Sequence, residues 1–342
     1  MKKVAFCTII LTLGIFLTGA LPATAALRYN CKDLGTLYNG KTYPYGINAA
    51  GQVVGKSASS SVAYHAFLYS GGVMHDLGTL GGSNSCAYAI NDAGQVAGYS
   101  ETAQGPRAFL YSGSMVSLGT LPTPYTSSSY AYGINAAGQV AGYSTGSSNQ
   151  SHAFLYSGGM VDLGTLPDPY NYISKAYGIN ALGQVVGYSQ SLYNVYHASL
   201  GMVDLLTLPG DWASQAYAIN AAGQVAGDSF STNSHAFLYS GGGMQPLGSL
   251  PAPYDGNSHA CGINNGGQVV GESTVADSSS RAFLYSGGVM LDLNSLVNLP
   301  GVNLYTAYGI NDRGQILANS SFDGYLLSPV SSLAALDLLL LQ

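Results

Sequence analysis

Residues 131–166 read AYGINAAGQVAGYS, then seven variable residues, then HAFLYSGGMVDLGTL. Versions of this stretch recur from Asp33 to Leu327. The motif I-N-x-x-G-Q occurs seven times, with its asparagine at Asn48, Asn91, Asn135, Asn180, Asn220, Asn264 and Asn311. The copies are 43, 44, 45, 40, 44 and 47 residues apart. A period near 44 is typical of propeller blades and of long solenoid repeats.

Each copy predicts four short strands. The first is Tyr-Gly-Ile-Asn, the second Gln-Val-x-Gly-x-Ser, the third Ala-Phe-Leu-Tyr-Ser and the fourth x-Met-Val-Asp-Leu-Gly-Thr-Leu. Short runs of aromatic and β-branched residues are strand signals. Asn-x-x-Gly and Ser-Gly-Gly predict tight turns, because Asn bonds nearby backbone and Gly accepts a positive φ. Each repeat is therefore expected to be an up-and-down meander.

Seven such meanders predict an all-β fold, a seven-bladed β-propeller of four-stranded antiparallel blades. Residues 33–37 resemble a fourth strand that has no first three before it. We expect them to complete the last blade and close the ring, with strand one innermost. Residues 335–341 partly match residues 202–208, so the alternatives for the tail are a fourth strand of its own, a competing outer strand or a helix. Residues 197–202 are shortened, so strand three of blade four, or its turn, should be cut back.

The two ends of the chain differ from the repeats. Lys2 and Lys3 precede an apolar run, Val4 to Leu21, and a small-x-small site at residues 23–25. This is the pattern of a secretory signal peptide, with an N-terminal membrane anchor as the alternative. The predicted domains are a signal peptide over 1–25, the propeller over 26–330 and a C-terminal apolar tail over 331–342. The tail is too short to span a membrane. We expect a secreted, extracellular or cell-envelope protein.

The charge of the chain argues against nucleic acid as a partner. Charged residues are 8% of the 342 residues, and the formal net charge is −6. Loss of residues 1–25 leaves eight basic against 16 acidic residues, a net charge of −8. Phosphate contacts dominate nucleic-acid affinity, so an acidic chain without a basic run is a poor binder. Cys31, Cys86 and Cys261 show no zinc-site spacing. We expect small buried side chains, with one disulfide as an alternative.

Three copies of His-Ala-Phe, at 65–67, 152–154 and 235–237, each lie between a Gly-Gln-Val strand and a Tyr-Ser-Gly turn. In this the chain resembles the bacterial extracellular repeat family called HAF, over nearly the whole mature length. Arg107 and Arg281 replace the histidine, Ser199 replaces the phenylalanine, and residues 324–326 read Gly-Tyr-Leu. The resemblance implies an extracellular repeat protein and no particular activity.

The variable loops indicate where a binding site is expected. In a meander blade, the two uniform turns fall on one face. The loops between strands two and three and between blades, which vary, fall on the other. Variable loops on a rigid scaffold usually carry recognition. Three of them contain Pro-x-Pro-Tyr, ending at Tyr125, Tyr170 and Tyr254, and Tyr172, Trp212 and Tyr305 lie in related loops. Proline-stiffened loops present rings that suit sugars or a partner surface; the alternative is that these rings pack over the blade ends.

Four acidic residues break the repeat in blades five and six. Asp228 and Glu272 end strand two, and Asp211 and Asp255 lie in the loops entering these blades. Two carboxylates about 5–10 Å apart are what a glycosidase needs, and carboxylate oxygens also suit Ca²⁺. The remaining alternative is a solvated acidic patch. No P-loop, dinucleotide, metalloprotease or nucleophile-elbow motif is present, so no other cofactor is expected.

Two repeated polar positions are predicted to be structural. The first is the His or Arg before Ala-Phe, at residues 65, 107, 152, 197, 235 and 281. Equivalent positions on different blades are too far apart to share a metal, so each should make a hydrogen bond within its blade. The second is the strand-four aspartate, at residues 33, 76, 162, 204 and 292, which should cap a turn or bond a neighbouring strand.

These patterns favour a non-enzymatic binding or adhesion module that recognises a glycan or a cell-surface protein through the variable face. The candidate ligand-binding residues are Tyr125, Tyr170, Tyr172, Trp212, Tyr254, Asp211, Asp228 and Glu272. One alternative is an extracellular carbohydrate-active enzyme, a glycoside hydrolase or lyase that uses the acids of blades five and six. Another is a purely structural envelope protein.

Overall fold

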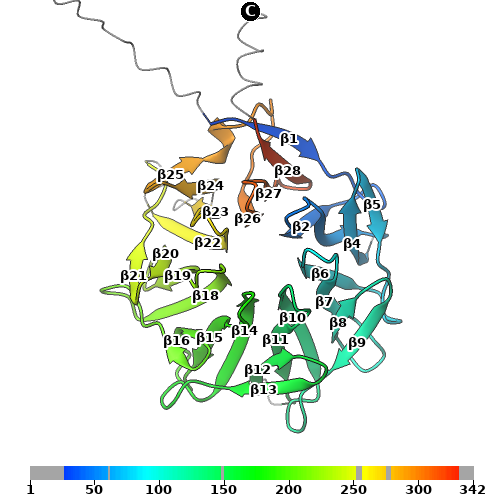
Figure 1. Cartoon of the computed structure of the whole chain (residues 1–342), viewed down its shortest axis with the longest axis vertical. Coiled ribbons are helices and arrows are strands. Elements are labelled where there is room, and N and C mark those ends of the chain that lie inside the picture. The colour runs from blue at the N-terminus through cyan, green and yellow to red at the C-terminus, as the bar shows by residue number, and fades with distance from the viewer. Residues whose placement is uncertain (1–26, 61, 148–149, 252–255, 275–278, 331–342) are drawn as a thin grey trace, which may run out of the picture. The chain divides into compact units, whose positions relative to one another are not determined.

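The computed structural model describes residues 27–60, 62–147, 150–251, 256–274 and 279–330. The predicted signal peptide and C-terminal tail lie outside these residues. Residues 28–330 form one compact unit. In it, seven four-stranded antiparallel sheets surround a central axis, as Figure 1 shows. The predicted seven-bladed β-propeller is therefore confirmed.

The strands of each blade run from the centre outward in chain order, except in the last blade. The innermost strands are β2 (Thr42–Ile47), β6 (Ser85–Ile90), β10 (Ser128–Ile134), β14 (Ile173–Ile179), β18 (Ala213–Ile219), β22 (Asn257–Ile263) and β26 (Thr306–Ile310). The second strands are β3 (Val53–Ala58), β7 (Val96–Ser100), β11 (Val140–Thr145), β15 (Val185–Gln190), β19 (Val225–Phe230), β23 (Val269–Thr274) and β27 (Ile316–Asn319).

The two outer positions complete the blades. The third strands are β4 (Tyr64–Ser70), β8 (Arg107–Tyr111), β12 (Ser151–Tyr156), β16 (Tyr196–Leu200), β20 (Ser234–Ser240), β24 (Ser280–Ser286) and β28 (Gly324–Pro329). The outermost strands are β5 (Val73–Asp76), β9 (Met115–Gly119), β13 (Met160–Gly164), β17 (Val203–Asp204), β21 (Gly243–Pro246), β25 (Val289–Asp292) and β1 (Tyr29–Asp33). A 3-10 helix, η1 (Leu293–Ser295), follows β25. In blade four the outermost strand β17 has two residues, whereas β16 has five, as β8 has, so the shortening predicted for strand three or its turn falls on strand four.

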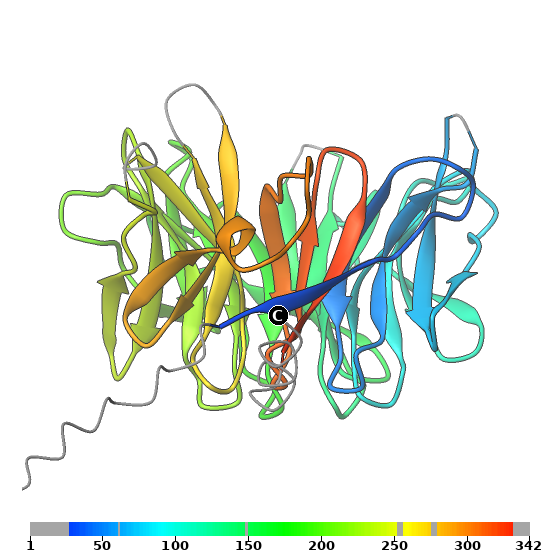
Figure 2. The ribbon, with the colours of Figure 1, turned by 90° about the horizontal axis from the view of Figure 1, so that it is seen from above.

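The N-terminal strand closes the ring, as predicted. β1 pairs antiparallel with β28, with Tyr29 opposite Pro329 and Asp33 opposite Tyr325, and Figure 2 shows this strand beside β28. The predicted bounds, residues 33–37, are wrong by four residues. The strand ends at Asp33 because its carboxylate accepts the backbone N–H of Gly35 at 2.8 Å, and Gly35 turns the chain with a φ of +73°.

The same aspartate turn ends β5 at Asp76 and β17 at Asp204, whereas β13 continues to Gly164. Asp76, Asp162 and Asp204 each accept the N–H two residues further on, at 2.7–2.8 Å. The strand-four aspartates therefore cap turns, which confirms their structural role. Their repeated occurrence reflects a local backbone requirement rather than chemistry.

A closed ring of asparagines joins the seven blades at their centre. In blade three, Asn135 Nδ2 donates to the Asn180 carbonyl oxygen at 3.1 Å and to Gln139 Oε1 at 2.8 Å. The equivalent bond to the next blade is present in every blade, at 3.0–3.2 Å, and the last runs from Asn311 back to Asn48. Each asparagine side chain is buried. This ring explains why I-N-x-x-G-Q is the most uniform motif of the chain.

Apolar contacts between blades form the core. The phenylalanine of strand three, which follows His-Ala or Arg-Ala, is fully buried in five blades, at Phe67, Phe109, Phe154, Phe237 and Phe283. Each packs with valine and isoleucine of its own blade, and Phe109 and Phe237 also pack with a valine of the preceding blade. Burying one such ring stabilises the fold by about 1.5–3 kcal/mol. The sheets thus form a rigid frame, and the inner strands hold side chains around the central channel.

Candidate binding pocket at the channel mouth

Every inner strand contains one β-bulge at the same place. In β10, Ala131 pairs with Gly142 and Gly133 with Ala141, so Tyr132 is the extra residue. A bulge re-aims the side chain of its extra residue, and here that side chain lines the central channel. The seven bulge residues are Tyr45, Tyr88, Tyr132, Tyr177, Tyr217, Cys261 and Tyr308.

Six of these residues form a continuous series of tyrosine rings, called the tyrosine arc below. Neighbouring ring centroids are separated by 5.3 Å for Tyr308–Tyr45, 5.2 Å for Tyr45–Tyr88, 4.5 Å for Tyr88–Tyr132, 5.1 Å for Tyr132–Tyr177 and 5.5 Å for Tyr177–Tyr217. Cys261 occupies the seventh position, and its short side chain cannot continue the series. The tyrosine arc is therefore broken at blade six.

A pocket of about 520 Å³, called the channel pocket below, includes this break. Besides the tyrosine arc, its lining residues are Asp228, His259, Ala260, Cys261 and Glu272. Its size falls in the range of small-ligand sites, about 300–1,000 Å³. Burial raises the pKa of the Tyr308 phenol to about 12, so this hydroxyl stays neutral near pH 7 and is able to donate a hydrogen bond. Two further segments of the channel have volumes of about 250 and 300 Å³. The first is lined by the bulge residues and the isoleucines of the repeat, and the second by these isoleucines and the asparagines.

An aspartate–histidine pair lies at the pocket. His259 Nδ1 is 2.7 Å from Asp228 Oδ2, and Asp228 Oδ1 accepts the Ala260 N–H at 2.9 Å. Burial raises the pKa of the Asp228 carboxyl, and the hydrogen bond from His259 opposes this shift. The hydrogen bond to Asp228 in turn raises the pKa of His259 above its ordinary value of 6.5. Because Nδ1 faces Asp228, Nε2 is the ring nitrogen available to a ligand.

Glu272 lies opposite His259 in the β22–β23 register. Its Oε2 accepts a hydrogen bond from the Thr306 hydroxyl at 2.6 Å. Asp228 and Glu272 thus come from adjacent blades to one pocket. Cys261 adds no nucleophile, because burial strongly raises the pKa of its thiol, and both carboxylates add to that shift.

The sequence interpretation singled out Asp228 and Glu272 and missed His259 and the tyrosine arc. The signal was present in the repeat itself. Blades one to five and seven carry tyrosine two residues before the isoleucine of the motif, and only blade six carries Cys261. The periodic tyrosines looked like ordinary strand residues, because the bulge that turns them to the channel is not visible in the sequence.

Asp211 is not among the residues that line the channel pocket. Asp211 Oδ2 lies 3.2 Å from His235 Nδ1, and the Asp211 side chain is only 4% exposed. In blade five the strand-four position is Pro246 instead of aspartate. Asp211 therefore takes the place of that aspartate as the partner of the His235 side chain. Asp255 and Tyr254 lie outside the described residues.

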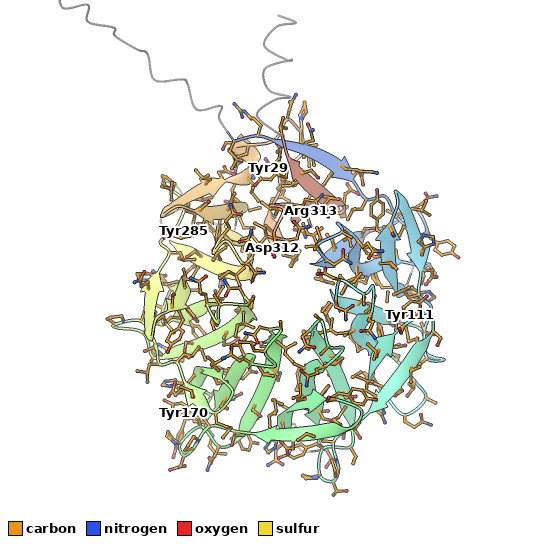
Figure 3. The ribbon with its side chains drawn as sticks, viewed as in Figure 1. Tyr29, Tyr111, Tyr170, Tyr285, Asp312 and Arg313 are labelled. Carbon is orange, nitrogen blue, oxygen red and sulfur yellow. The ribbon has the colours of Figure 1, made fainter. Side chains whose placement is uncertain are left out.

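Two of the Pro-x-Pro-Tyr rings pack on the histidines that precede Ala-Phe or Ala-Ser in strand three. Tyr125 stacks on His152 with ring centroids 4.2 Å apart, and Tyr170 stacks on His197 at 4.0 Å. Figure 3 places Tyr170 toward the outer rim of the ring of blades. Tyr172, by contrast, is half-buried, and its N–H donates to the Gln190 carbonyl oxygen.

Trp212 is 51% exposed and begins a series of aromatic rings. This series, called the aromatic row below, runs from Trp212 to Phe230, Tyr196 and Tyr188, with centroid separations of 5.7, 6.2 and 5.2 Å. Tyr188 lies 5.9 Å from Tyr177 of the tyrosine arc. The aromatic row therefore connects an exposed ring of blade five with the channel pocket.

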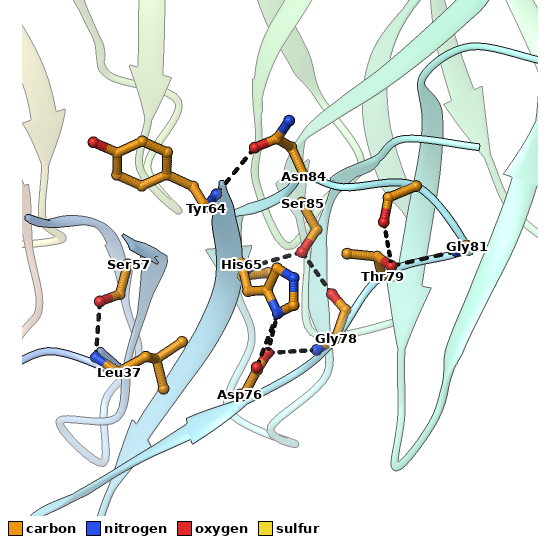
Figure 4. A network of polar contacts seen from close by, with 12 residues as sticks. Leu37, Ser57, Tyr64, His65, Asp76, Gly78, Thr79, Gly81, Asn84 and Ser85 are labelled. Carbon is orange, nitrogen blue, oxygen red and sulfur yellow. Dashed lines mark hydrogen bonds and ion pairs between the residues drawn. The ribbon is translucent and has the colours of Figure 1, made fainter. Parts of the chain in front are cut away.

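His65, His152 and His197 bond within their own blades, as predicted, whereas Arg107 also donates to the Ser127 carbonyl oxygen, just before the first strand of blade three. His65 Nδ1 is 2.8 Å from Asp76 Oδ2, which Figure 4 shows together with the turn at Gly78. His152 and His197 repeat this pair with Asp162 and Asp204. Within the described part of the chain, no group of three or more His, Cys, Asp or Glu side chains is placed to hold a metal ion.

No family model and no curated protein matches this chain. Solved structures do resemble it. Streptogramin B lyase is 11% identical with a TM-score of 0.54, covering 89% of this chain and 98% of that one. Virginiamycin B lyase from Staphylococcus aureus is 12% identical with a TM-score of 0.56, covering 88% and 100%. The β-propeller domain of the Trilobed protease from Pyrococcus furiosus is 12% identical with a TM-score of 0.51, covering 74% and 84%. At such identities the likeness shows the propeller fold alone. In the described residues, no helix is long and apolar enough to cross a membrane.

Proposed function

We propose that the chain is a secreted or cell-envelope binding module of HAF-type repeats that takes a glycan in the channel pocket. The observation that carries this proposal is the break in the tyrosine arc at Cys261, beside Asp228, His259 and Glu272. Aromatic rings offer faces on which sugars stack, and a few convergent polar groups orient a ligand. The aromatic row supports the proposal, because it offers further rings along which a longer glycan can lie.

The test begins with the mature chain from Ala26 on a glycan array, followed by titration calorimetry with the strongest ligands. Cys261→Tyr gives blade six the residue of the other six blades and should fill the break, so the affinity should fall at least about tenfold. Tyr170→Ala is the matched control at the outer rim and should leave the affinity unchanged. Circular dichroism verifies that both variants fold.

Two outcomes would contradict the proposal. If Tyr170→Ala abolishes binding and Cys261→Tyr does not, the binding site lies in the Pro-x-Pro-Tyr loops. If no glycan binds the mature chain, the ligand class is wrong.

A carbohydrate-active enzyme is the second candidate function, and the Asp228–His259 pair favours it. A buried carboxylate that orients a histidine through Nδ1 prepares Nε2 to accept or return a proton. Asp228 is engaged by His259 and the Ala260 N–H, so Asp228 is a positioning group for His259 rather than one of two free carboxylates.

Glycans that bind should be incubated with the wild type and with His259→Gln, and new reducing or unsaturated ends should be counted. Product formation that disappears in His259→Gln, with affinity retained, supports the enzyme. The absence of product from every bound glycan rejects it.

A further inference from the structure

The ionisable side chains of the channel pocket are predominantly acidic. Asp228 and Glu272 supply two carboxyl groups, and His259 is the one basic side chain among the described residues that line the pocket. His259 is bonded to Asp228. Glu272 accepts a hydroxyl hydrogen bond from Thr306 and forms no ion pair within the described residues. A cationic group on a ligand would balance the charge of Glu272, whereas an anionic group would be repelled.

The tyrosine arc favours the same ligand charge. The face of a tyrosine ring carries negative potential and attracts an ammonium group within about 6 Å of its centroid. Six tyrosines line the channel pocket. Aromatic rings around an ammonium group are a common means by which proteins recognise organic cations.

The chain already binds its own ammonium groups in this way. Each of the four lysines in the described residues lies over an aromatic ring. Lys56 lies 5.2 Å from both Tyr43 and Tyr64, and Lys175 lies 4.6 Å from Tyr143. Lys56 and Lys175 belong to blades one and four. At the equivalent positions of the first two strands, blade five has Gln215 facing Asp228, and blade six has His259 facing Glu272. The mouth of the channel therefore has a lysine in blades one and four. In blades five and six, which form the break in the tyrosine arc, it has acidic side chains and no lysine at these positions.

We propose that the glycan of the channel pocket carries a protonated amine, so that the ligand class is an amino sugar with a free ammonium group. The ammonium group pairs with Glu272 and lies against the tyrosine arc at the break left by Cys261. The sugar rings extend toward the aromatic row. This inference rests on the proposed function, because it names the ligand class of the same pocket.

The experiment compares two oligosaccharides of equal length, a glucosamine tetramer and an N-acetylglucosamine tetramer, by titration calorimetry with the mature chain. The amine form should bind at least about tenfold more tightly, and its affinity should fall as salt screens the charge. Glu272→Gln removes the charge and keeps the shape, so the preference for the amine form should disappear.

Asp92→Asn is the matched control. It makes the same change of charge at Asp92, in the Asn-x-x-Gly turn on the opposite face, where the carboxylate accepts the Ala49 N–H. Asn265 makes the equivalent contact with Ala221 in blade five, so this variant should fold normally and keep the amine preference.

The outcomes separate this inference from the proposed function. Equal affinity for both tetramers overturns the amino-sugar inference and leaves the glycan proposal standing. An amine preference that survives Glu272→Gln overturns the pairing of the ammonium group with Glu272. If neither tetramer binds, tetramethylammonium chloride serves as the probe. Binding of that salt, lost in Glu272→Gln, supports the ammonium site and overturns the amino sugar as its ligand. No binding of any of the three probes overturns the ammonium site, and the glycan array decides the proposed function separately.

Discussion

The asparagine ring makes a quantitative prediction about stability, tested by Asn135→Asp. The new carboxylate keeps the two acceptor bonds, from the N–H groups of Ala137 and Gln139. It loses the two donor bonds, to Gln139 Oε1 and to the Asn180 carbonyl oxygen. Two lost hydrogen bonds cost about 1 kcal/mol each, and a buried acceptor left unsatisfied costs about 1–3 kcal/mol more. The free energy of unfolding should therefore fall by about 3–5 kcal/mol at pH 7.

The loss should also depend on pH, and the sign is determined by the new carboxyl group. Burial against two oxygen acceptors raises the folded-state pKa of residue 135 in the variant above the unfolded value of about 3.9. The deficit is therefore complete above the folded-state pKa and shrinks as the pH falls toward the unfolded value, because the protonated carboxyl donates a bond again. Urea unfolding followed by circular dichroism at pH 4 and pH 7 measures both effects.

Asn298→Asp is the matched control, because it makes the same change of charge at an exposed asparagine. The free energy of unfolding of this variant should stay within about 0.5 kcal/mol of the wild-type value, as for most surface substitutions. A loss below about 1 kcal/mol for Asn135→Asp, or a loss equal at both pH values, would refute the role assigned to the asparagine ring.

Three further predictions concern closure, the pocket and the thiols. Removal of residues 26–33 takes away the five residue pairs that β1 makes with β28. Amide hydrogen exchange at Leu326 and Leu327 should then accelerate at least about tenfold. Unchanged protection of these amides would contradict closure of the ring by β1. The pKa of His259, followed by NMR, should lie above about 6.5 and should fall in Asp228→Asn. The stabilisation that this pair contributes should be complete below about pH 6.5 and be lost as the pH rises through the folded-state pKa of His259. A His259 pKa that does not change in Asp228→Asn would refute the pairing. Burial raises the pKa of the Cys31 and Cys86 thiols to about 12. A disulfide exchange reagent at pH 8 should therefore react with the native chain at least about tenfold more slowly than with the unfolded chain. Equal rates would show that the thiols are accessible.

Some features of the fold follow from local chemistry, and these were predictable. The spacing of Asn135 from its counterparts gives the number of blades, and the tight turns give the number of strands per blade. The unpaired strand near Asp33 predicted closure, because a strand needs a partner at its edge. Its bounds were wrong because Asp33 reads as an interior strand residue, whereas its carboxylate in fact ends the strand by capping Gly35.

The candidate site was predictable only in part. Asp228 and Glu272 were identified because they break a repeat, and repeat-breaking acids are rare in a chain with 8% charged residues. Trp212 was identified as an exposed ring, yet its place in the aromatic row depends on Phe230 and Tyr196, which are distant in sequence. Tyr170 looked equally promising and instead packs on His197.

The sequence alone determined the repeat, the blade count and the chain segment that closes the ring, because these depend on period and on turn chemistry within about 44 residues. The tertiary structure alone decided where side chains from different blades meet. The bulges turn six tyrosines into one arc, the ring of blades brings Asp228 next to His259, and the short side chain of Cys261 opens the pocket between Tyr217 and Tyr308. Such contacts join residues of separate repeats across a closed ring, and no local pattern encodes them.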